Sequence, residues 1–204
     1  MNYDDMLDYV HKKLLENNAI NHTLRFPFRN RFKHIKRVYM WCLKLLEDDL
    51  VVDKEAVLVS AIFHDSGYAK GKINHAASSV EIFKEYALKN NLDKDFEAKV
   101  SDLIAKHSMK QYLDDPNTPM ELIILLEADL LDEEGALGIV WDLFAEGRRD
   151  PNDYEKALEA INEHSAHIFN QDFMVTPIAK KIWEEKQDFV KGFIQELSND
   201  LFIK

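Results

Sequence analysis

The pair His64-Asp65 is the part of this sequence with the clearest capacity for chemistry. It ends an apolar stretch that begins at Ala56 and runs through Phe63. An imidazole and a carboxylate at the end of a buried helix are costly unless another group pairs with them, and a divalent metal is the obvious partner. The pair therefore predicts a metal site.

Two further residues extend the pattern. His34 recurs with Val38 on one face of a predicted helix, so it points the same way as apolar residues. Asp129 lies inside a second apolar run, which begins at Leu122. Buried carboxylates are rare unless they are paired, which favours a common partner for these side chains. The predicted metal ligands are His34, His64, Asp65 and Asp129.

These residue types suit a hydrolytic metal centre. Histidine nitrogens and carboxylate oxygens bind Mn, Mg, Fe, Co, Ni or Zn, and four protein ligands leave coordination positions for water and substrate. A metal-bound water whose pKa falls to about 7 supplies hydroxide as a nucleophile, while the cation neutralises charge on a phosphoryl oxygen. We therefore expect a divalent metal cofactor, with Asp65 a catalytic residue as well as a ligand.

His75 and His107 are the next candidates for catalytic residues. His75 lies near a predicted helix start, and His107 ends an apolar helix face. Each could complete a second metal site, contact phosphate, serve as general acid to a leaving oxygen, or be a hydrogen-bonded structural residue. Lys70 follows Asp65 in a glycine-containing loop and is a candidate phosphate contact, although surface lysines are common.

A basic stripe surrounds His34. No acidic residue occurs between Glu16 and Glu47, although the net charge of the chain is -11. The stripe is either a solvated helix face or a funnel for an anionic substrate. We predict substrate contacts from Arg31, Lys33, Lys70 and Asp132, the last of these one turn beyond Asp129. The basic residues of the stripe are Arg25, Arg29, Arg31, Lys33, Lys36, Arg37 and Lys44.

Three other features carry no functional prediction. The segment 67–73 is one spacer short of a P-loop, ends in Ile73 where Ser or Thr would bind magnesium, and follows a predicted helix. His164 and His167 have no acidic stripe facing inward with them, which favours a structural or surface role. Cys42 lies among apolar residues and is expected to be a small core residue rather than a nucleophile.

Composition narrows the class of protein. A chain of 204 residues with 46% apolar content can bury its own core. The acidic net charge argues against affinity for nucleic acid or anionic lipid. A single cysteine excludes an internal disulfide, the N-terminus lacks the layout of a signal peptide, and no apolar run reaches about 18 residues. We expect a cytoplasmic protein with neither a membrane nor a stable nucleic-acid partner; oligomerisation stays open.

The periodicity predicts an all-α fold. Glycine occupies only six positions and proline five, and no alternating run is long enough to demand a sheet. Asp53 and Asn74 are candidate N-caps, and the prediction leaves 66–72 and 116–119 as loops. Helices are expected over about 3–17, 30–49, 53–65, 74–89, 93–108, the run around Asp129, 153–169 and 175–198.

The order of these residues resembles the HD-domain superfamily of metal-dependent phosphohydrolases, whose signature is His, then His-Asp, then a distant Asp. Within it, the chain is similar to small freestanding bacterial HD proteins described as predicted hydrolases. The likeness spans most of 25–198, and it departs from the family at Leu130, where arginine is common, and at Asn74, where a basic residue is common. The matching elements are Lys33 to Val38, Ala61 to Asp65, His75 with Ser78-Ser79, Lys106 to Ser108, Glu127 to Gly138 and Phe173 to Ala179.

The resemblance implies an HD-domain helical bundle with a metal at its centre. We expect an N-terminal helix (1–24), the HD domain (25–147) and C-terminal helices packed on the HD domain (148–204), together forming one structural unit. The implied activity is hydrolysis of a phosphate ester or phosphoanhydride, with a nucleotide the favoured small phosphorylated substrate. Two alternatives stay open: an HD-type di-iron oxygenase, which His75 and His107 would serve, and a non-enzymatic nucleotide-sensing module.

Overall fold

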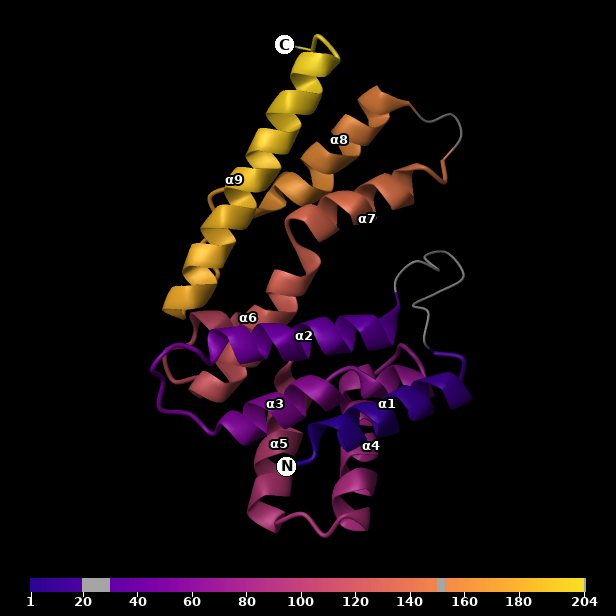
Figure 1. The fold of residues 1–204 in the computed structure, drawn as a ribbon, viewed down its shortest axis with the longest axis vertical. Coiled ribbons are helices and arrows are strands. Elements are labelled where there is room, and N and C mark those ends of the chain that lie inside the picture. The colour runs from indigo at the N-terminus through magenta and orange to yellow at the C-terminus, as the bar shows by residue number, and fades with distance from the viewer. Residues whose placement is uncertain (20–29, 150–152, 204) are drawn as a thin grey trace. The chain divides into compact units, whose positions relative to one another are not determined.

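The structure of the protein is a computed structural model that describes residues 1–19, 30–149 and 153–203. Within these ranges the chain forms helices and no β-strand, which confirms the all-α prediction. The α-helices are α1 (Tyr3–Glu16), α2 (Arg31–Leu45), α3 (Lys54–Phe63), α4 (His75–Lys89), α5 (Lys94–Lys106), α6 (Met120–Glu133), α7 (Ala136–Glu146), α8 (Tyr154–His164) and α9 (Pro177–Asp200) (Figure 1). Three short 3-10 helices join them: η1 (Ser66–Lys70), η2 (Lys110–Asp114) and η3 (Ser165–Ile168).

The contacts divide the chain into two compact units, which we call unit 1 (Met1–Asp129) and unit 2 (Leu130–Lys204). Helix α6 runs through the boundary. The segments 1–24, 25–147 and 148–204 suggested by the sequence are a different division and stay a prediction. No helix of the described residues is both long enough and apolar enough to cross a membrane.

Helix α3 is the central element of unit 1. It contacts α1, α2, α4 and α5 (Figure 1). Every residue from Ala56 to Phe63 is buried, which explains why this helix is apolar on all sides. Its start is set by Asp53, whose side chain accepts a hydrogen bond from the Ala56 N–H at 3.0 Å, as predicted for an N-cap. The helix therefore delivers His64 and Asp65 to the interior of the unit.

Three local predictions in unit 1 are corrected by the structure. The loop expected over 66–72 contains η1, because its residues pack tightly enough on α4 to form a helical turn. Asn74 stands at the N-cap position of α4, but its backbone is left-handed (φ 57°) and its side chain makes no capping hydrogen bond. The helix expected over 30–49 ends at Leu45, before a run of acidic residues that the negative end of a helix disfavours.

Unit 2 contains α7, α8 and α9, which contact one another. Its core includes Ile161, Trp183 and Val190. Gly135 adopts a positive φ of 75° and separates α6 from α7, whereas Gly138 lies within α7. The glycines therefore end one helix without preventing the next, and α7 is an element that the sequence prediction missed.

Candidate metal centre

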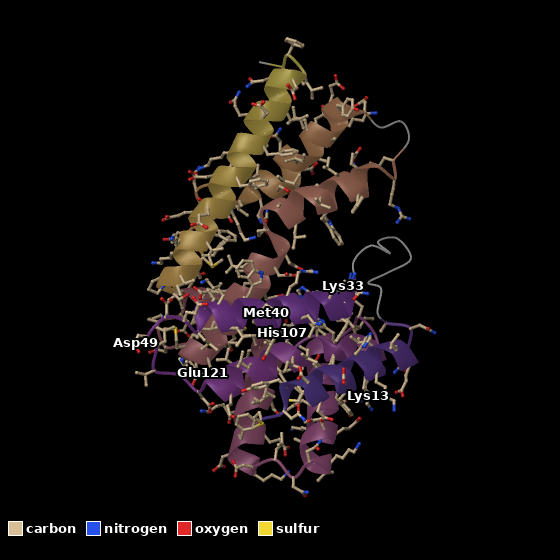
Figure 2. The ribbon with its side chains drawn as sticks, viewed as in Figure 1. Lys13, Lys33, Met40, Asp49, His107 and Glu121 are labelled. Atoms are coloured by element: carbon tan, nitrogen blue, oxygen red, sulfur yellow. The ribbon has the colours of Figure 1, made fainter. Side chains whose placement is uncertain are left out.

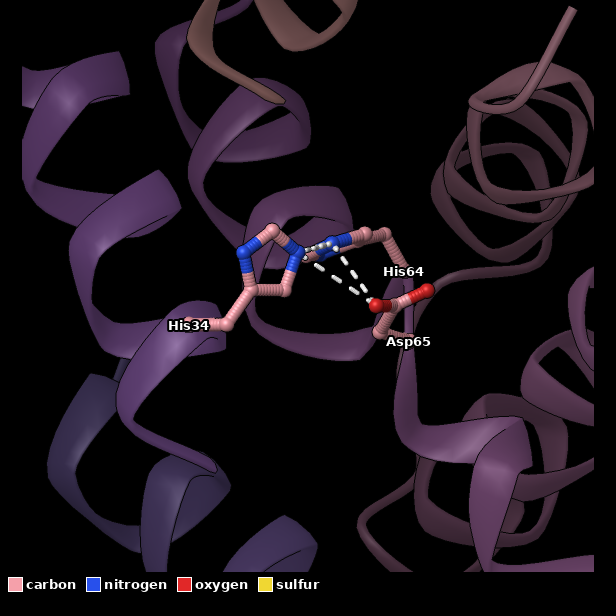
Figure 3. A group of neighbouring side chains, drawn as sticks. All are labelled: His34, His64 and Asp65. Carbon is pink, nitrogen blue, oxygen red and sulfur yellow. Dashed lines mark hydrogen bonds and ion pairs between the residues drawn. The ribbon is translucent and has the colours of Figure 1, made fainter. Parts of the chain in front are cut away.

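His34, His64 and Asp65 meet inside unit 1, although they come from α2, the end of α3 and the start of η1 (Figure 3). The Nε2 atoms of His34 and His64 lie 3.3 Å apart. Asp65 Oδ2 lies 3.4 Å from His34 Nε2 and 3.6 Å from His64 Nε2. All three residues are at least 97% buried, with exposures of 2%, 0% and 3%. We call this group the first cluster.

Asp129 of α6 lies against the first cluster. Its Oδ1 is 3.4 Å from His34 Nε2 and 4.0 Å from His64 Nε2. Its Oδ2 pairs with the ammonium of Lys110 at 2.6 Å. The carboxylate thus divides its two oxygens between the histidines and a lysine. The structure therefore brings together all four residues that the sequence predicts as metal ligands.

A second cluster forms on the other oxygen of Asp65. Asp65 Oδ1 lies 3.5 Å from His75 Nε2 and 3.4 Å from His107 Nε2. The two histidine nitrogens are themselves 3.2 Å apart. His75 is the first residue of α4 and His107 caps the end of α5. One buried carboxylate is therefore shared between two histidine pairs that come from four different helices.

The donor atoms fit a metal. The His64 Nδ1–H donates to the Ala61 carbonyl at 2.8 Å, which leaves the Nε2 lone pair of a neutral ring directed at His34 and Asp65. Ligands that bind one metal at about 2.1 Å lie about 3.0–3.4 Å from one another, close to the separations of the first cluster. Lone pairs that converge without a hydrogen between them repel, and a cation removes that repulsion. Each cluster could hold a metal ion.

Burial and neighbouring charges set the protonation of the site. Burial lowers the pKa of His64 to about 4, against the opposing effect of Asp65, so this ring is neutral near pH 7. Burial alone would raise the pKa of Asp65, but His64, which is protonated at the acid pH where Asp65 titrates, and Arg31 outweigh it and hold this pKa well below its usual range. Burial likewise opposes the ionisation of Asp129, yet Lys110 and His34 hold its pKa well below the usual range. Neutral imidazoles and ionised carboxylates are the forms that bind metals.

His75 and His107 of the second cluster differ in proton affinity. Burial would lower the pKa of His107, but a hydrogen bond to Asp65 and the charge of that carboxylate raise it above its ordinary value. Burial lowers the pKa of His75 despite the charge of Asp65. The His107 Nδ1–H donates to the Ile104 carbonyl at 2.7 Å, so an additional proton resides on Nε2, which faces the site. One ring of the pair is therefore suited to donate a proton and the other to accept one.

Among the described residues of the basic stripe, Arg31 enters the site. It is 3% exposed and donates through Nη1 to Asp65 Oδ2, while its buried Nε has no hydrogen-bond partner among the residues that the structure describes. Its guanidinium stacks on the ring of Tyr68, with Cζ 3.8 Å from the ring centre. The Tyr68 ring also packs against His75, with 4.6 Å between ring centroids. Tyr68 therefore contacts both Arg31 and His75, which face opposite oxygens of Asp65.

The other predicted substrate contacts lie elsewhere. The Lys70 ammonium pairs with Glu81 at 2.9 Å and with Glu85 at 3.5 Å. Lys33 is exposed on α2, whereas His107 is buried within unit 1 (Figure 2). Asp132 is buried and belongs to unit 2. The structure thus gathers Arg31, but not Lys70, around Asp65.

The features without a functional prediction also have clear positions. Cys42 is fully buried, and burial raises the pKa of its thiol, in keeping with a core residue. His167 lies in η3 with its Nε2 3.5 Å from Glu134 Oε1. Arg25 and Arg29 of the basic stripe lie outside the described residues. Two site residues, Tyr68 and Lys110, were not predicted; the only sequence signal for Lys110 is its position three residues after His107.

Comparison with known proteins identifies the family. The HD domain matches residues 31–134, about half of the chain, and the chain therefore belongs to the HD domain family. No curated protein matches the sequence.

Three solved structures show the same fold. An HD-superfamily hydrolase from Bacillus thuringiensis has a TM-score of 0.72 and 18% identity, covering 99% of this chain and 97% of that one. A predicted HD superfamily hydrolase from an uncultured Thermotogales bacterium has a TM-score of 0.63 and 20% identity, with coverages of 97% and 92%. Bacillus subtilis YpgQ in complex with ADP has a TM-score of 0.66 and 20% identity, with coverages of 98% and 97%.

Proposed function

We propose that this protein is a divalent-metal-dependent phosphohydrolase and that its substrate is a nucleotide. The observation that carries the proposal is the sharing of Asp65 between two histidine pairs, with Arg31 on the same carboxylate. Buried histidines and carboxylates at these separations favour a metal site, and a buried guanidinium favours an anionic substrate. The ADP bound by the related YpgQ supports a nucleotide as that substrate.

In this proposal His34, His64, Asp65 and Asp129 hold the metal. Bound there, a divalent cation lowers the pKa of a coordinated water and withdraws charge from a phosphoryl oxygen. Arg31 orients the phosphoryl group through its guanidinium, which Tyr68 and Asp65 keep in place. The low pKa of Asp65 makes it a ligand and hydrogen-bond acceptor rather than a store of protons.

The histidines of the second cluster move protons in the proposed reaction. Hydrolysis forms a bond between phosphorus and the water oxygen and breaks the bond to the leaving oxygen. His107, whose Nε2 lies 3.4 Å from Asp65 and whose Nδ1 contacts the Ile104 carbonyl, gives a proton to the leaving oxygen, and the neighbouring His75 accepts one from the attacking water. Their Nε2 atoms are 3.2 Å apart, so a proton can return from His75 to His107 after each turnover.

The substrate is tested by phosphate and pyrophosphate release from a panel of nucleotides and phosphomonoesters. The protein is stripped with a chelator, reloaded with manganese and compared with Asp65→Ala. We expect release by the wild-type protein alone. A wild-type protein that binds ADP but releases nothing from any compound would instead support the sensing module.

One observation favours a second candidate function. The Asp65, His75 and His107 group could hold a second metal beside the first, as a di-iron oxygenase requires. Anaerobic loading with iron followed by Mössbauer spectroscopy separates the two proposals. Two coupled irons per chain that react with dioxygen would favour the oxygenase, whereas a single uncoupled iron would eliminate it.

A further inference from the structure

Lys110 is a cation that reaches both the site and the solvent. It is the first residue of η2, three positions after His107, so the end of α5 places both residues at the centre. Its ammonium lies 2.6 Å from Asp129 Oδ2, and its side chain is 37% exposed. The guanidinium of Arg31, by contrast, is almost completely buried. Lys110 can therefore contact both an incoming anion and the metal ligand Asp129.

The anchoring of η2 limits where this ammonium can go. The Thr118 hydroxyl donates to the Tyr112 carbonyl at 2.7 Å, and the Tyr112 N–H donates to the Met109 carbonyl at 3.1 Å. These bonds hold the backbone of Lys110 beside the site while its long side chain keeps rotational freedom. An ammonium on a fixed backbone can change its partner without moving the fold.

The pairing with Asp129 is suited to such an exchange. Partly exposed ion pairs contribute little net free energy, because water competes for both groups. A phosphoryl group carries more charge than one carboxylate and offers several oxygens to a lysine. Asp129 would keep Oδ1 toward the histidines when Lys110 leaves Oδ2, so the exchange would leave the metal ligand in place.

We infer that Lys110 binds the phosphoryl group of the substrate and sets substrate affinity, an inference that rests on the proposed function. The alternative is that Lys110 only orders Asp129 as a metal ligand. The two roles differ in what they change: loss of a substrate contact weakens phosphate binding at full metal content, whereas loss of an ordering contact lowers metal content.

The test compares the wild-type protein, Lys110→Met, Lys110→Arg and a matched control, Lys106→Met. Lys106 is also a lysine on a carboxylate, with 2.7 Å between its ammonium and Asp102, but it lies outside the site. Each protein is loaded with manganese, its metal content is measured, and inorganic phosphate is titrated by calorimetry. Nucleotide hydrolysis gives KM and kcat separately.

We expect Lys110→Met to raise KM and the Kd for phosphate by about 10- to 100-fold, the loss typical of a charged hydrogen bond, with unchanged manganese content. Lys110→Arg should recover most of the affinity, and Lys106→Met should match the wild type. Unchanged phosphate affinity in Lys110→Met, or a loss of manganese that accounts for its lower affinity, would overturn the inference. If the wild type hydrolyses no nucleotide, the proposed function fails. The phosphate titration then still tests whether Lys110 binds a phosphoryl group. A wild-type protein that binds no phosphate would refute that role.

Discussion

The guanidinium of Arg31 stacks on the ring of Tyr68, with 3.8 Å between Cζ and the ring centre. The same ring lies against His75. Because Arg31 and His75 face opposite oxygens of Asp65, one aromatic side chain supports both sides of the shared carboxylate. Tyr68 of η1 therefore helps to position the groups around Asp65.

Replacing Tyr68 with leucine should impair catalysis more than folding. A cation–π contact at a partly desolvated site contributes about 1–2 kcal/mol, so kcat/KM should fall by roughly 5- to 30-fold. Tyr68→Phe keeps the ring face and should retain most of the activity. Equal activity of the leucine and wild-type proteins would show that the stack does not orient Arg31.

Gly67 of η1 lies directly against α4, and its N–H donates to the Ser79 hydroxyl at 2.8 Å. A Cβ at this position would lie 1.9 Å from the His75 carbonyl oxygen and 2.4 Å from the Ser79 nitrogen. Both are backbone atoms that cannot move aside. Gly67→Ala should therefore lower the free energy of unfolding by about 3 kcal/mol or more and should displace Tyr68 and His75.

Gly192 in α9 is the matched control, because an added Cβ meets no atom within 4 Å. Gly192→Ala should raise the free energy of unfolding by about 0.5–1 kcal/mol through its higher helix propensity. Denaturant unfolding of both variants measures the difference. If the two substitutions changed the free energy of unfolding equally, η1 could not lie as close to α4 at Gly67 as the structure shows.

Asp142 in unit 2 makes stability depend on pH. Burial raises its pKa, although a hydrogen bond from the Ser165 hydroxyl opposes the shift. A carboxyl whose pKa is higher in the folded protein favours folding at low pH, and that contribution is lost as pH rises through the folded pKa. Asp142→Asn, which keeps an acceptor for Ser165, should therefore melt at a higher temperature than the wild type near pH 8.

For a chain of this size, each kcal/mol gained in the free energy of unfolding should raise the melting temperature of Asp142→Asn by about 2–4 °C. This gain should shrink as pH falls through the raised folded pKa of Asp142 and should be gone below about 4, where the carboxyl is neutral in the unfolded chain as well. Thermal unfolding of both proteins at several pH values measures this trend. A wild-type protein that is more stable than Asp142→Asn at pH 8 would mean that Asp142 is stabilised as a carboxylate.

The helices of unit 1 were predictable because local patterns and tertiary packing agree there. The apolar run before His64 is buried on all sides, and the Asp53 cap lies where the sequence places it. The short helix η1 was not predictable, since it depends on packing against α1 and α4. The sequence of α7 contains Gly138, and only packing in unit 2 shows that the helix continues through it.

The candidate ligands could be anticipated because histidine and aspartate are chemically conspicuous within apolar runs. The structure adds that the ligand atoms of these residues lie within 4.8 Å of one another in each cluster. Lys110 could not be found in the same way, because a lysine in a polar segment of the sequence looks like any other. Its role emerges only from the distance to Asp129, a residue nineteen positions away.

The most direct test of the central claim is a titration of chelator-stripped protein with manganese, following nucleotide hydrolysis and bound metal together. We expect a rate that is zero without metal and rises in proportion to bound manganese. We also expect that Asp65→Asn, with one buried carboxylate neutralised, binds manganese weakly and hydrolyses nothing at the same concentrations. Hydrolysis by fully stripped protein, or equal manganese binding by Asp65→Asn, would contradict the central claim.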